Sequence, residues 1–507
     1  MTIEYRVAID RDHSGDFAAG EDISADVLAL RWRLGMRAPY DSLADYGEAL
    51  ITLCNRAGAY SPERNALPIG ARVRIQSRRQ DVARSHFIGF ISHIETDAGE
   101  LGRRRALLHL RDIQVWLAQA QALLPPQVEV TADQVIAQLL DKAILRRPAL
   151  AGYLFIDRPG SNRIDSARIF PAQNVAQELA AGKTRFAYVG DWWDESTSSR
   201  TAIGELAASE RGRFYINRAG KAVFLNRRYT LLHKTLGAHF IDDMAGCDYV
   251  YGDDQLNRLT LQVSPRAIGA AGSLLWKLPN PQRVPPRSDT RLTIQLVDER
   301  GQPIGLLAFE RLVARFQLGS NPESREVKRN ILVKVEQLGA TSLQVRVCNY
   351  HRRALWMSLL NVYGTPLYRG APLQVRAQDV ASLHIHGVRG QTRELPALSN
   401  TNTAQAFADY EVAQRRKPSG LIRELRLDAR QHPAAALGLS LFDRVRISES
   451  HTGHKERDYF IVAEAHEVSA GGTMHKLRWT LEPADMTRYF LVDSSRIDAG
   501  NAMIMPF

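Results

Sequence analysis

Two stretches of the sequence decide its fold. Residues 72–112 contain the runs RVRI, HFIGFISHIE and RALLHLRD, and residues 444–485 contain RVRI, DYFIVAEAHE and KLRWTLEPAD. Each run has the length and apolar pattern of a strand, and in both stretches a glycine-containing turn precedes the third run, as in an antiparallel meander. Val73 lies 20 positions before His93, and Val445 lies 21 positions before His466. The shared tetrapeptide and this spacing predict two copies of one β-barrel in a single chain.

The segments between these stretches predict other kinds of structure. Apolar residues at helical spacing favour helices over 132–145, 201–209 and 403–416, the first with Thr131 as its N-cap. Two β-rich runs around Gly220 predict a hairpin over 213–225. Between 290 and 380, β runs follow one another without a long helix, which is typical of a β-sandwich.

We therefore expect a mainly β protein with an α+β part: two antiparallel β-barrels in one chain, an α+β domain between them and an inserted β-sandwich. The expected parts are the first barrel at 1–120, the α+β domain at 121–250, the second barrel at 251–289 with 401–490, the sandwich at 290–400 and a C-terminal tail at 491–507.

The composition is that of a globular protein. Of 507 residues, 45% are hydrophobic and 24% charged, which excludes a wholly disordered chain. No run approaches the ~18 apolar residues of a membrane helix, and the first residues lack the apolar block of a signal peptide. Cys54, Cys247 and Cys348 lie far apart, which argues against a zinc ribbon or a disulfide framework and indicates folding in a reducing cytosol.

The chain is basic, with a net charge of +11. Because the charge is spread along the chain, solvated faces and subunit contacts explain it better than a dedicated DNA-binding surface. Basic residues near strand ends of the first predicted barrel are candidates for lining a channel or for pairing with carboxylates of a neighbouring ring; they are Arg78, Arg79, Arg103, Arg104 and Arg105.

Several short motifs, in order along the chain, resemble the hub and tail-associated proteins of bacteriophage tails and contractile injection systems. They are YGEALITLCNRAGAYSP at 46–62, GARVRI at 70–75, FIGFI at 87–91 and SLHIHGVR at 382–389. His386 stands where that family usually has tyrosine. The sandwich has no counterpart in the simplest members of the family.

The resemblance implies a homotrimeric hub at the distal end of a tail, assembled in the host cytoplasm, with barrels like those of the tail tube. Three chains with two equivalent barrels each make a ring of six. Such a ring would join a hexameric tail tube or distal tail protein to a central spike or fibre. It would also let the tape-measure protein and, transiently, DNA pass.

The sequence contains few motifs for chemistry. Trp192 and Trp193 could stack on a sugar or a partner, or pack in the core. His384 and His386 would share one face of a strand, but no further ligand follows at metal spacing. The loop with His451 and His454 reads as solvated.

We expect no catalytic residues, no metal and no cofactor. The chain lacks a GxSxG elbow, an HExxH motif, a phosphate-binding loop and a dinucleotide fingerprint. Two alternatives remain open. One is a cell-wall or polysaccharide hydrolase using acids such as Asp191, Asp194 and Glu195, and the other is a carbohydrate-binding receptor module.

Overall fold

The structure is a computed structural model that describes residues 3–11, 17–65, 67–97, 104–145, 176–298, 301–321 and 323–487. Strands make up 49% and helices 17%, so the expected mainly β class is confirmed. Among the described helices, none has the length and apolar character needed to cross a membrane. The C-terminal tail expected at 491–507 lies outside the described residues.

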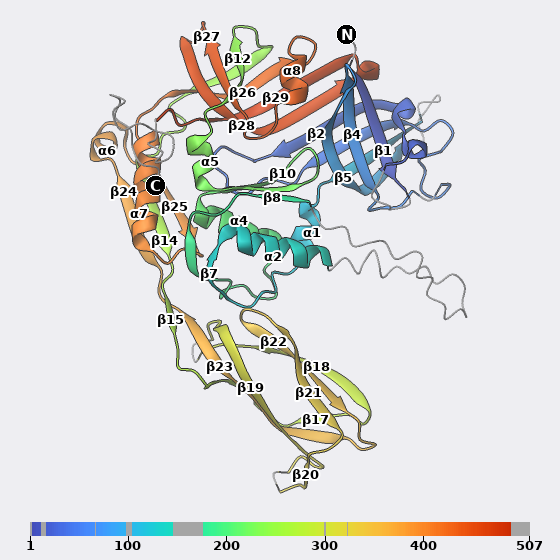
Figure 1. Ribbon diagram of the computed structural model, residues 1–507, viewed down its shortest axis with the longest axis vertical. Coiled ribbons are helices and arrows are strands. Elements are labelled where there is room, and N and C mark those ends of the chain that lie inside the picture. The colour runs from blue at the N-terminus through green and yellow to red at the C-terminus, as the bar shows by residue number, and fades with distance from the viewer. Residues whose placement is uncertain are drawn as a thin grey trace.

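The first six strands form what we call the N-terminal β unit (Figure 1). Their order in the sheet is β1-β4-β5-β6-β3-β2, with antiparallel neighbours throughout. The alternating patterns seen in the sequence place Val73 and Ile75 in the core and Arg72 and Arg74 outside. The strands are β1 (Glu4–Asp10), β2 (Val27–Gly35), β3 (Glu48–Cys54), β4 (Arg72–Arg79), β5 (Val82–Asp97) and β6 (Arg105–Arg111).

Six later strands form the C-terminal β unit, in the order β12-β27-β28-β29-β26-β13. Read in chain order, these strands take the same places in the sheet as β1 to β6. One pairing differs, because β12 runs parallel to β27 whereas β1 runs antiparallel to β4. The strands are β12 (Leu236–Ile241), β13 (Gly246–Tyr251), β26 (Gly420–Asp428), β27 (Arg444–Glu449), β28 (His454–Ser469) and β29 (Met474–Pro483).

The two units are joined by β2 and β28, which pair antiparallel from Leu30 opposite Val468 to Gly35 opposite Ala463. Gly35 is required there, because it has a φ of +106° and a Cβ would lie 2.3 Å from the Val462 carbonyl oxygen. All twelve strands therefore belong to one sheet, and no sheet of the described residues closes into a barrel. The expectation of two closed barrels is wrong in this respect, since the edge of one unit continues into the other.

The α+β part lies beneath this sheet in Figure 1. Ser198 caps α4 through the backbone N–H of Thr201, and Arg211 ends it in a left-handed conformation. The hairpin of β10 and β11 forms around Gly220 as expected, and β8 joins it in parallel. The elements are α1 (Gln114–Gln119), β7 (Gln127–Thr131), α2 (Ala132–Leu145), β8 (Gln177–Leu179), β9 (Arg185–Val189), α4 (Ser199–Glu210), β10 (Arg213–Ile216), β11 (Ala222–Leu225) and α5 (Arg227–Leu232).

A separate three-stranded sheet has β14 (Arg258–Val263) between β24 (Leu373–Gln378) and β25 (Gly390–Leu395). We expected the strand near Asn257 in the second barrel, and we assigned β12 and β13 to the α+β part; strand pairing places them otherwise. The expected third helix forms as α7 (Thr401–Arg415) and packs on β14 and β24.

The remaining strands form two sheets around one apolar core, and they extend away from the rest of the chain in Figure 1. One sheet contains β15 (Arg266–Ile268), β16 (Ser273–Lys277), β17 (Gln282–Val284), β19 (Gly305–Gln317), β20 (Glu326–Val327) and β23 (Leu355–Arg369). The other contains β18 (Ser288–Gln295), β21 (Ile331–Leu338) and β22 (Ser342–Asn349).

Candidate functional site

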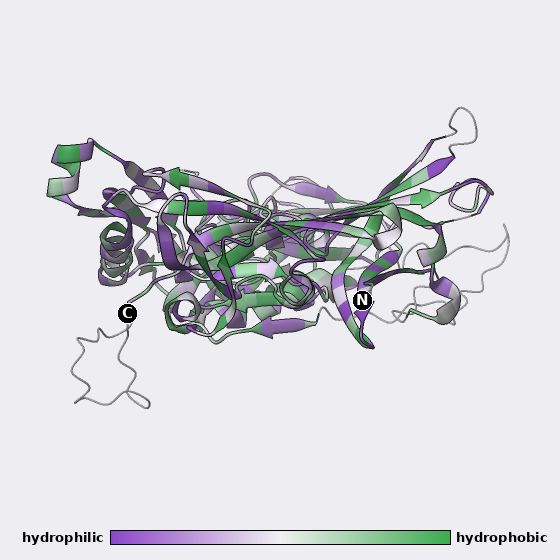
Figure 2. Cartoon of the chain, turned by 90° about the horizontal axis from the view of Figure 1, so that it is seen from above, coloured by the Kyte–Doolittle hydropathy of each residue, from purple (hydrophilic) through white to green (hydrophobic). Residues whose placement is uncertain are grey.

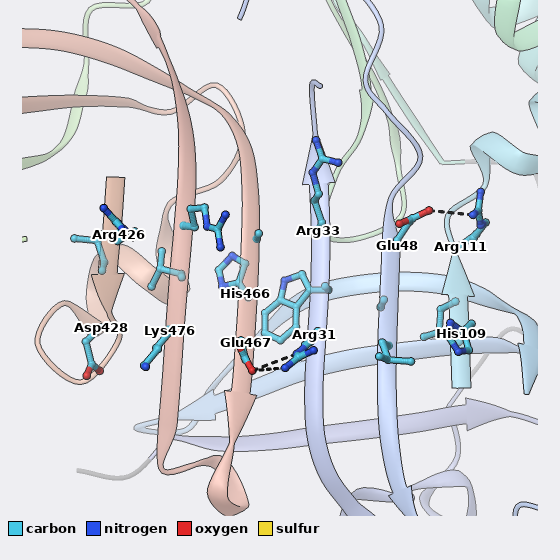
Figure 3. A pocket seen from close by; sticks show the side chains of 18 of the residues that line it. Arg31, Arg33, Glu48, His109, Arg111, Arg426, Asp428, His466, Glu467 and Lys476 are labelled. Atoms are coloured by element: carbon cyan, nitrogen blue, oxygen red, sulfur yellow. Dashed lines mark hydrogen bonds and ion pairs between the residues drawn. The ribbon is translucent and has the colours of Figure 1, made fainter. Parts of the chain in front are cut away.

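One face of the joined sheet carries a polar groove that crosses both β units (Figure 3). Its cavity volume is about 880 Å³. The polar lining of the groove results from the alternation of side chains along the strands. On β2, Leu30, Trp32 and Leu34 are buried, while Arg31 and Arg33 point outward. The charged side chains that line the groove, together with two histidines, are Arg31, Arg33, Glu48, His93, His109, Arg111, Arg426, Asp428, Glu467, Lys476 and Arg478.

Most charges in the groove are paired across strands. Arg31 of β2 lies 2.7 Å from Glu467 of β28, so this ion pair crosses the joint between the two units. Arg111 lies 3.1 Å from Glu48. The groove is therefore a solvated surface of mixed charge with a slight basic excess, and the described residues that line it include no pair of close, desolvated carboxylates.

A cluster of histidines lies in the core below the groove, where the two units meet. His86 comes from the N-terminal unit, and His466 and His475 come from the C-terminal unit. His475 Nε2 lies 2.9 Å from His466 Nδ1, and the Tyr5 hydroxyl lies 2.6 Å from His475 Nδ1. The Trp32 ring stacks on His466 with centroids 4.6 Å apart.

These imidazoles are held neutral. Burial, with the positive Arg218 nearby, lowers the pKa of His86 and brings the pKa of His475 down to about 2. Burial also lowers the pKa of His466, against the effect of the adjacent Glu464. With neutral imidazoles, the Tyr5 hydroxyl can donate to His475 Nδ1 while His475 Nε2–H donates to His466 Nδ1.

The α+β part is attached to this joint by Arg218, in the turn between β10 and β11. Its guanidinium donates to both carboxylate oxygens of Glu464 at 2.7 and 2.6 Å, and its carbonyl accepts from the Ser85 hydroxyl of β5. Burial alone would raise the pKa of Glu464, but the Arg218 charge and His466 lower it to about 2. One turn therefore contacts the C-terminal unit through a buried ion pair and the N-terminal unit through a hydrogen bond.

The basic residues predicted from the sequence do not form one cluster. Arg78 is ion-paired with Asp81 at 2.7 Å, beyond the groove. Arg79 is half-buried at the end of β4, and Arg104 precedes β6. Arg105 lies on the outer face of β6, the same face as His109 and Arg111, and the residues between them alternate with buried ones. Arg103 lies outside the described residues.

The two tryptophans are parts of the packed interior. Trp193 is 1% exposed, and both indole N–H groups donate to Glu205 Oε2, at 2.8 and 3.0 Å. Trp192 is half-buried beneath the Arg266 guanidinium. Asp191 is buried and ion-paired with Arg266, and Asp194 accepts hydrogen bonds from Ser196 and Thr197, so these acids have structural partners.

Two histidine expectations need correction. His384 and His386 lie in the last turn of a helix, α6 (Val380–His386), and not on a strand. Asp379 caps that helix through the Ser382 N–H, a signal that the sequence contains. His454 is not in the solvated loop that we expected, because it begins β28, is buried, and lies 2.9 Å from the Tyr459 hydroxyl.

Sequence reasoning missed most of the groove. Its charged residues occur in alternating runs, such as RWR at 31–33 and KLR at 476–478, which read as ordinary solvent-facing positions. Only the pairing of β2 with β28 brings these runs together.

Comparison with known proteins gives structural likeness only. No family model and no curated protein sequence matches this chain. A tail protein from Neisseria meningitidis is similar with a TM-score of 0.49 and 9% identity, over 94% of this chain and 97% of that protein. The 43 kDa tail protein of a prophage in Shewanella oneidensis has a TM-score of 0.48 and 8% identity, over 95% and 98%. A type VI secretion component from Escherichia coli, described as similar to two bacteriophage T4 tail proteins, has a TM-score of 0.36 and 8% identity, over 91% and 74%.

Proposed function

We propose that this protein is a structural hub of a phage tail tip, baseplate or related injection machine. Three copies would form a pseudo-six-fold ring that joins a hexameric tail tube to a trimeric spike or fibre. The observation that carries the proposal is the strand-for-strand match between the two β units, together with the way that β2 and β28 join them.

The match extends to irregularities that a chance meander would not share. A register shift falls between Ile91 and His93 in the pairing of β5 with β6, and one falls between Ile461 and Ala463 in the pairing of β28 with β29. A second shared shift follows Ile75 in the pairing of β4 with β5 and Ile447 in the pairing of β27 with β28. These shared features support an internal duplication as the origin of the two units.

Each chain has two sheet edges that would close such a ring. The strand order ends at β13, and residues 92–97 of β5 pair only with β6 among the described strands. Within the chain, β2 pairs with β28; by equivalence, β13 of one copy would pair with β5 of the next. Tyr251 on β13 is 66% exposed, which is consistent with an edge that a partner covers.

In this arrangement the groove face would line the channel. A mixed, slightly basic, solvated surface would let the tape-measure protein and DNA pass without holding either tightly. The α+β part would support the ring from below, and the two-sheet unit of β15 to β23, which we assign as the inserted sandwich, would decorate its periphery.

The first test is the mass of the purified chain by light scattering, followed by electron-microscope class averages. We expect a species near three times 56.8 kDa and a ring of six similar lobes. A chain that stays monomeric at every concentration tested would contradict the ring.

A cysteine pair tests the edges directly. Arg31 lies opposite Glu467 in the joint within the chain, and the equivalent residues are Asp248 on β13 and Asp97 on β5. The variant Asp248→Cys/Asp97→Cys, with the three natural cysteines changed to serine, should oxidise to a covalent trimer. The matched control Asp248→Cys/Asp81→Cys should not, because Asp81 lies in the turn between β4 and β5. Equal cross-linking in both variants would contradict the proposed pairing.

A further inference from the structure

We propose that His93, Glu95 and His109 form a binding site for a divalent transition-metal ion, zinc in the first place, with one site per chain. These three residues lie on the groove face of the N-terminal β unit, His93 and Glu95 on β5 and His109 on β6. Their ligand atoms all lie within 4.8 Å of one another. The inference concerns this chain alone and does not depend on the ring.

Two of the ligand distances lie close to those of tetrahedral coordination. Bonds of about 2.0–2.2 Å from zinc to nitrogen and oxygen place the ligand atoms of a tetrahedral site roughly 3.3–3.6 Å apart. Glu95 Oε1 lies 3.3 Å from His109 Nε2 and 3.7 Å from His93 Nε2. Two imidazoles and one carboxylate also form an open ligand set, which leaves the fourth position to water.

A β-bulge brings the two histidines together. Ile91 pairs with Leu110 and points into the core, so regular alternation would turn Ser92 outward and His93 inward. The register shift after Ile91 instead places His93 directly opposite His109, on the outer face. The two rings stack with centroids 4.0 Å apart and an interplanar angle of 13°.

Ser92 orients the first histidine. Its hydroxyl donates to the His109 carbonyl at 2.9 Å and lies 3.2 Å from His93 Nδ1. The hydroxyl proton is therefore committed to the carbonyl, so His93 Nδ1 carries a hydrogen and donates to Ser92. This tautomer leaves the Nε2 lone pair directed at Glu95, as in the outer-sphere hydrogen bonds of known metal-binding histidines.

The ring nitrogen of His109 that lies 3.3 Å from Glu95 makes no hydrogen bond of regular geometry with the described residues. The described residues supply no hydrogen-bond partner for His109 Nε2, although that atom is shielded from solvent. A carboxylate oxygen and two ring nitrogens converge here, and a cation satisfies all three at once.

The C-terminal unit shows that the fold does not need these residues. The same register positions on β28 and β29 are held by Ala463, Ala465 and Thr480, which cannot form such a site. Since the C-terminal unit has no ligands at these positions, we expect each chain to bind one ion and not two.

The test is a calorimetric titration of the full chain, freed of metal by a chelator, with Zn²⁺. We expect one ion per chain and loss of that binding in His93→Gln, Glu95→Gln and His109→Gln. The control His384→Gln removes an exposed histidine from α6 and should leave the titration unchanged.

Co²⁺ provides a second measurement that reports geometry. The intact chain should give the strong visible absorption of four-coordinate cobalt, and His109→Gln should lose it while its circular dichroism stays that of the parent. Absence of stoichiometric binding, binding that survives all three substitutions, or equal loss in His384→Gln would overturn the proposal.

Discussion

The N-terminal and C-terminal β units have the same strand order but differ at their edges and joints. In the N-terminal unit, β1 runs antiparallel to β4, and no described strand covers the edge of β5 beyond its pairing with β4. In the C-terminal unit, β12 runs parallel to β27, and the corresponding edge of β28 is covered by β2. The interior of the repeated unit is thus constant, while its edges are adapted to different neighbours.

The view from above in Figure 2 shows the joined sheet nearly edge-on, with apolar and polar residues alternating along its strands. Buried polar groups interrupt this pattern below the joint. Three histidines and the pair of Arg218 with Glu464 occupy the core there, and at the position of Glu464 the N-terminal unit has Ile94. The joint has therefore replaced apolar packing with a polar network that depends on protonation.

Acid should have the largest effect on the joint. The pKa values of His86, His466 and His475 are lowered in the folded state, so the unfolded chain takes up protons first as the pH falls below about 6.5. Each histidine costs about 1.4 kcal/mol of stability per pH unit only once the pH is well below that value. Between pH 7.5 and 5.5, roughly one unit either side of it, the three together should cost about 4 kcal/mol in total, and urea unfolding across this range measures the slope.

The variant His475→Gln tests how much of the pH dependence of stability comes from the buried histidines and how much from other titrating groups. It should reduce the slope by about one third, because one of three histidines is gone. A parental slope in His475→Gln would show that the buried histidines do not govern acid stability.

Breaking the buried ion pair should have the next largest effect. Glu464→Gln leaves the Arg218 guanidinium buried without a counter-charge, which costs about 3–5 kcal/mol of unfolding free energy. The double variant Glu464→Ile/Arg218→Met, which gives the C-terminal unit the residue type of Ile94, should recover most of that loss. If the double variant is no more stable than Glu464→Gln, the cost lies in packing and not in the unpaired charge.

Local pattern predicted the elements of both units but not their neighbours. The RVRI runs became β4 and β27, and the helix expected at 132–145 begins and ends where predicted. The pairing of β2 with β28 brings together residues more than 400 positions apart, and periodicity carries no information on such partners. For the same reason, β12 and β13 were assigned to the α+β part and not to the C-terminal β unit, where strand pairing places them.

The candidate site was harder to predict for a related reason. Spacing alone aligned His93 with His466, whereas strand register aligns His93 with Ala463, because the hairpins before the two strands differ in length. His466 is buried and His93 is exposed, so the apparent match joined residues with different roles. A bulge shifts side chains from one face to the other, and it has no signature in composition.

Removing the ion pair that crosses the joint on the surface should have the smallest effect. Arg31 and Glu467 lie 2.7 Å apart, but their side chains are 64% and 49% exposed, so solvent screens the attraction. Arg31→Ala should lower the unfolding free energy by no more than about 1 kcal/mol, a loss that salt should diminish. Arg6→Ala, which breaks the exposed pair with Glu4 within β1, is the matched control and should behave alike. If urea unfolding shows that Arg31→Ala lowers the unfolding free energy several times more than Arg6→Ala, then surface charge also stabilises the joint. The stability of the joint would then not come from the buried network alone.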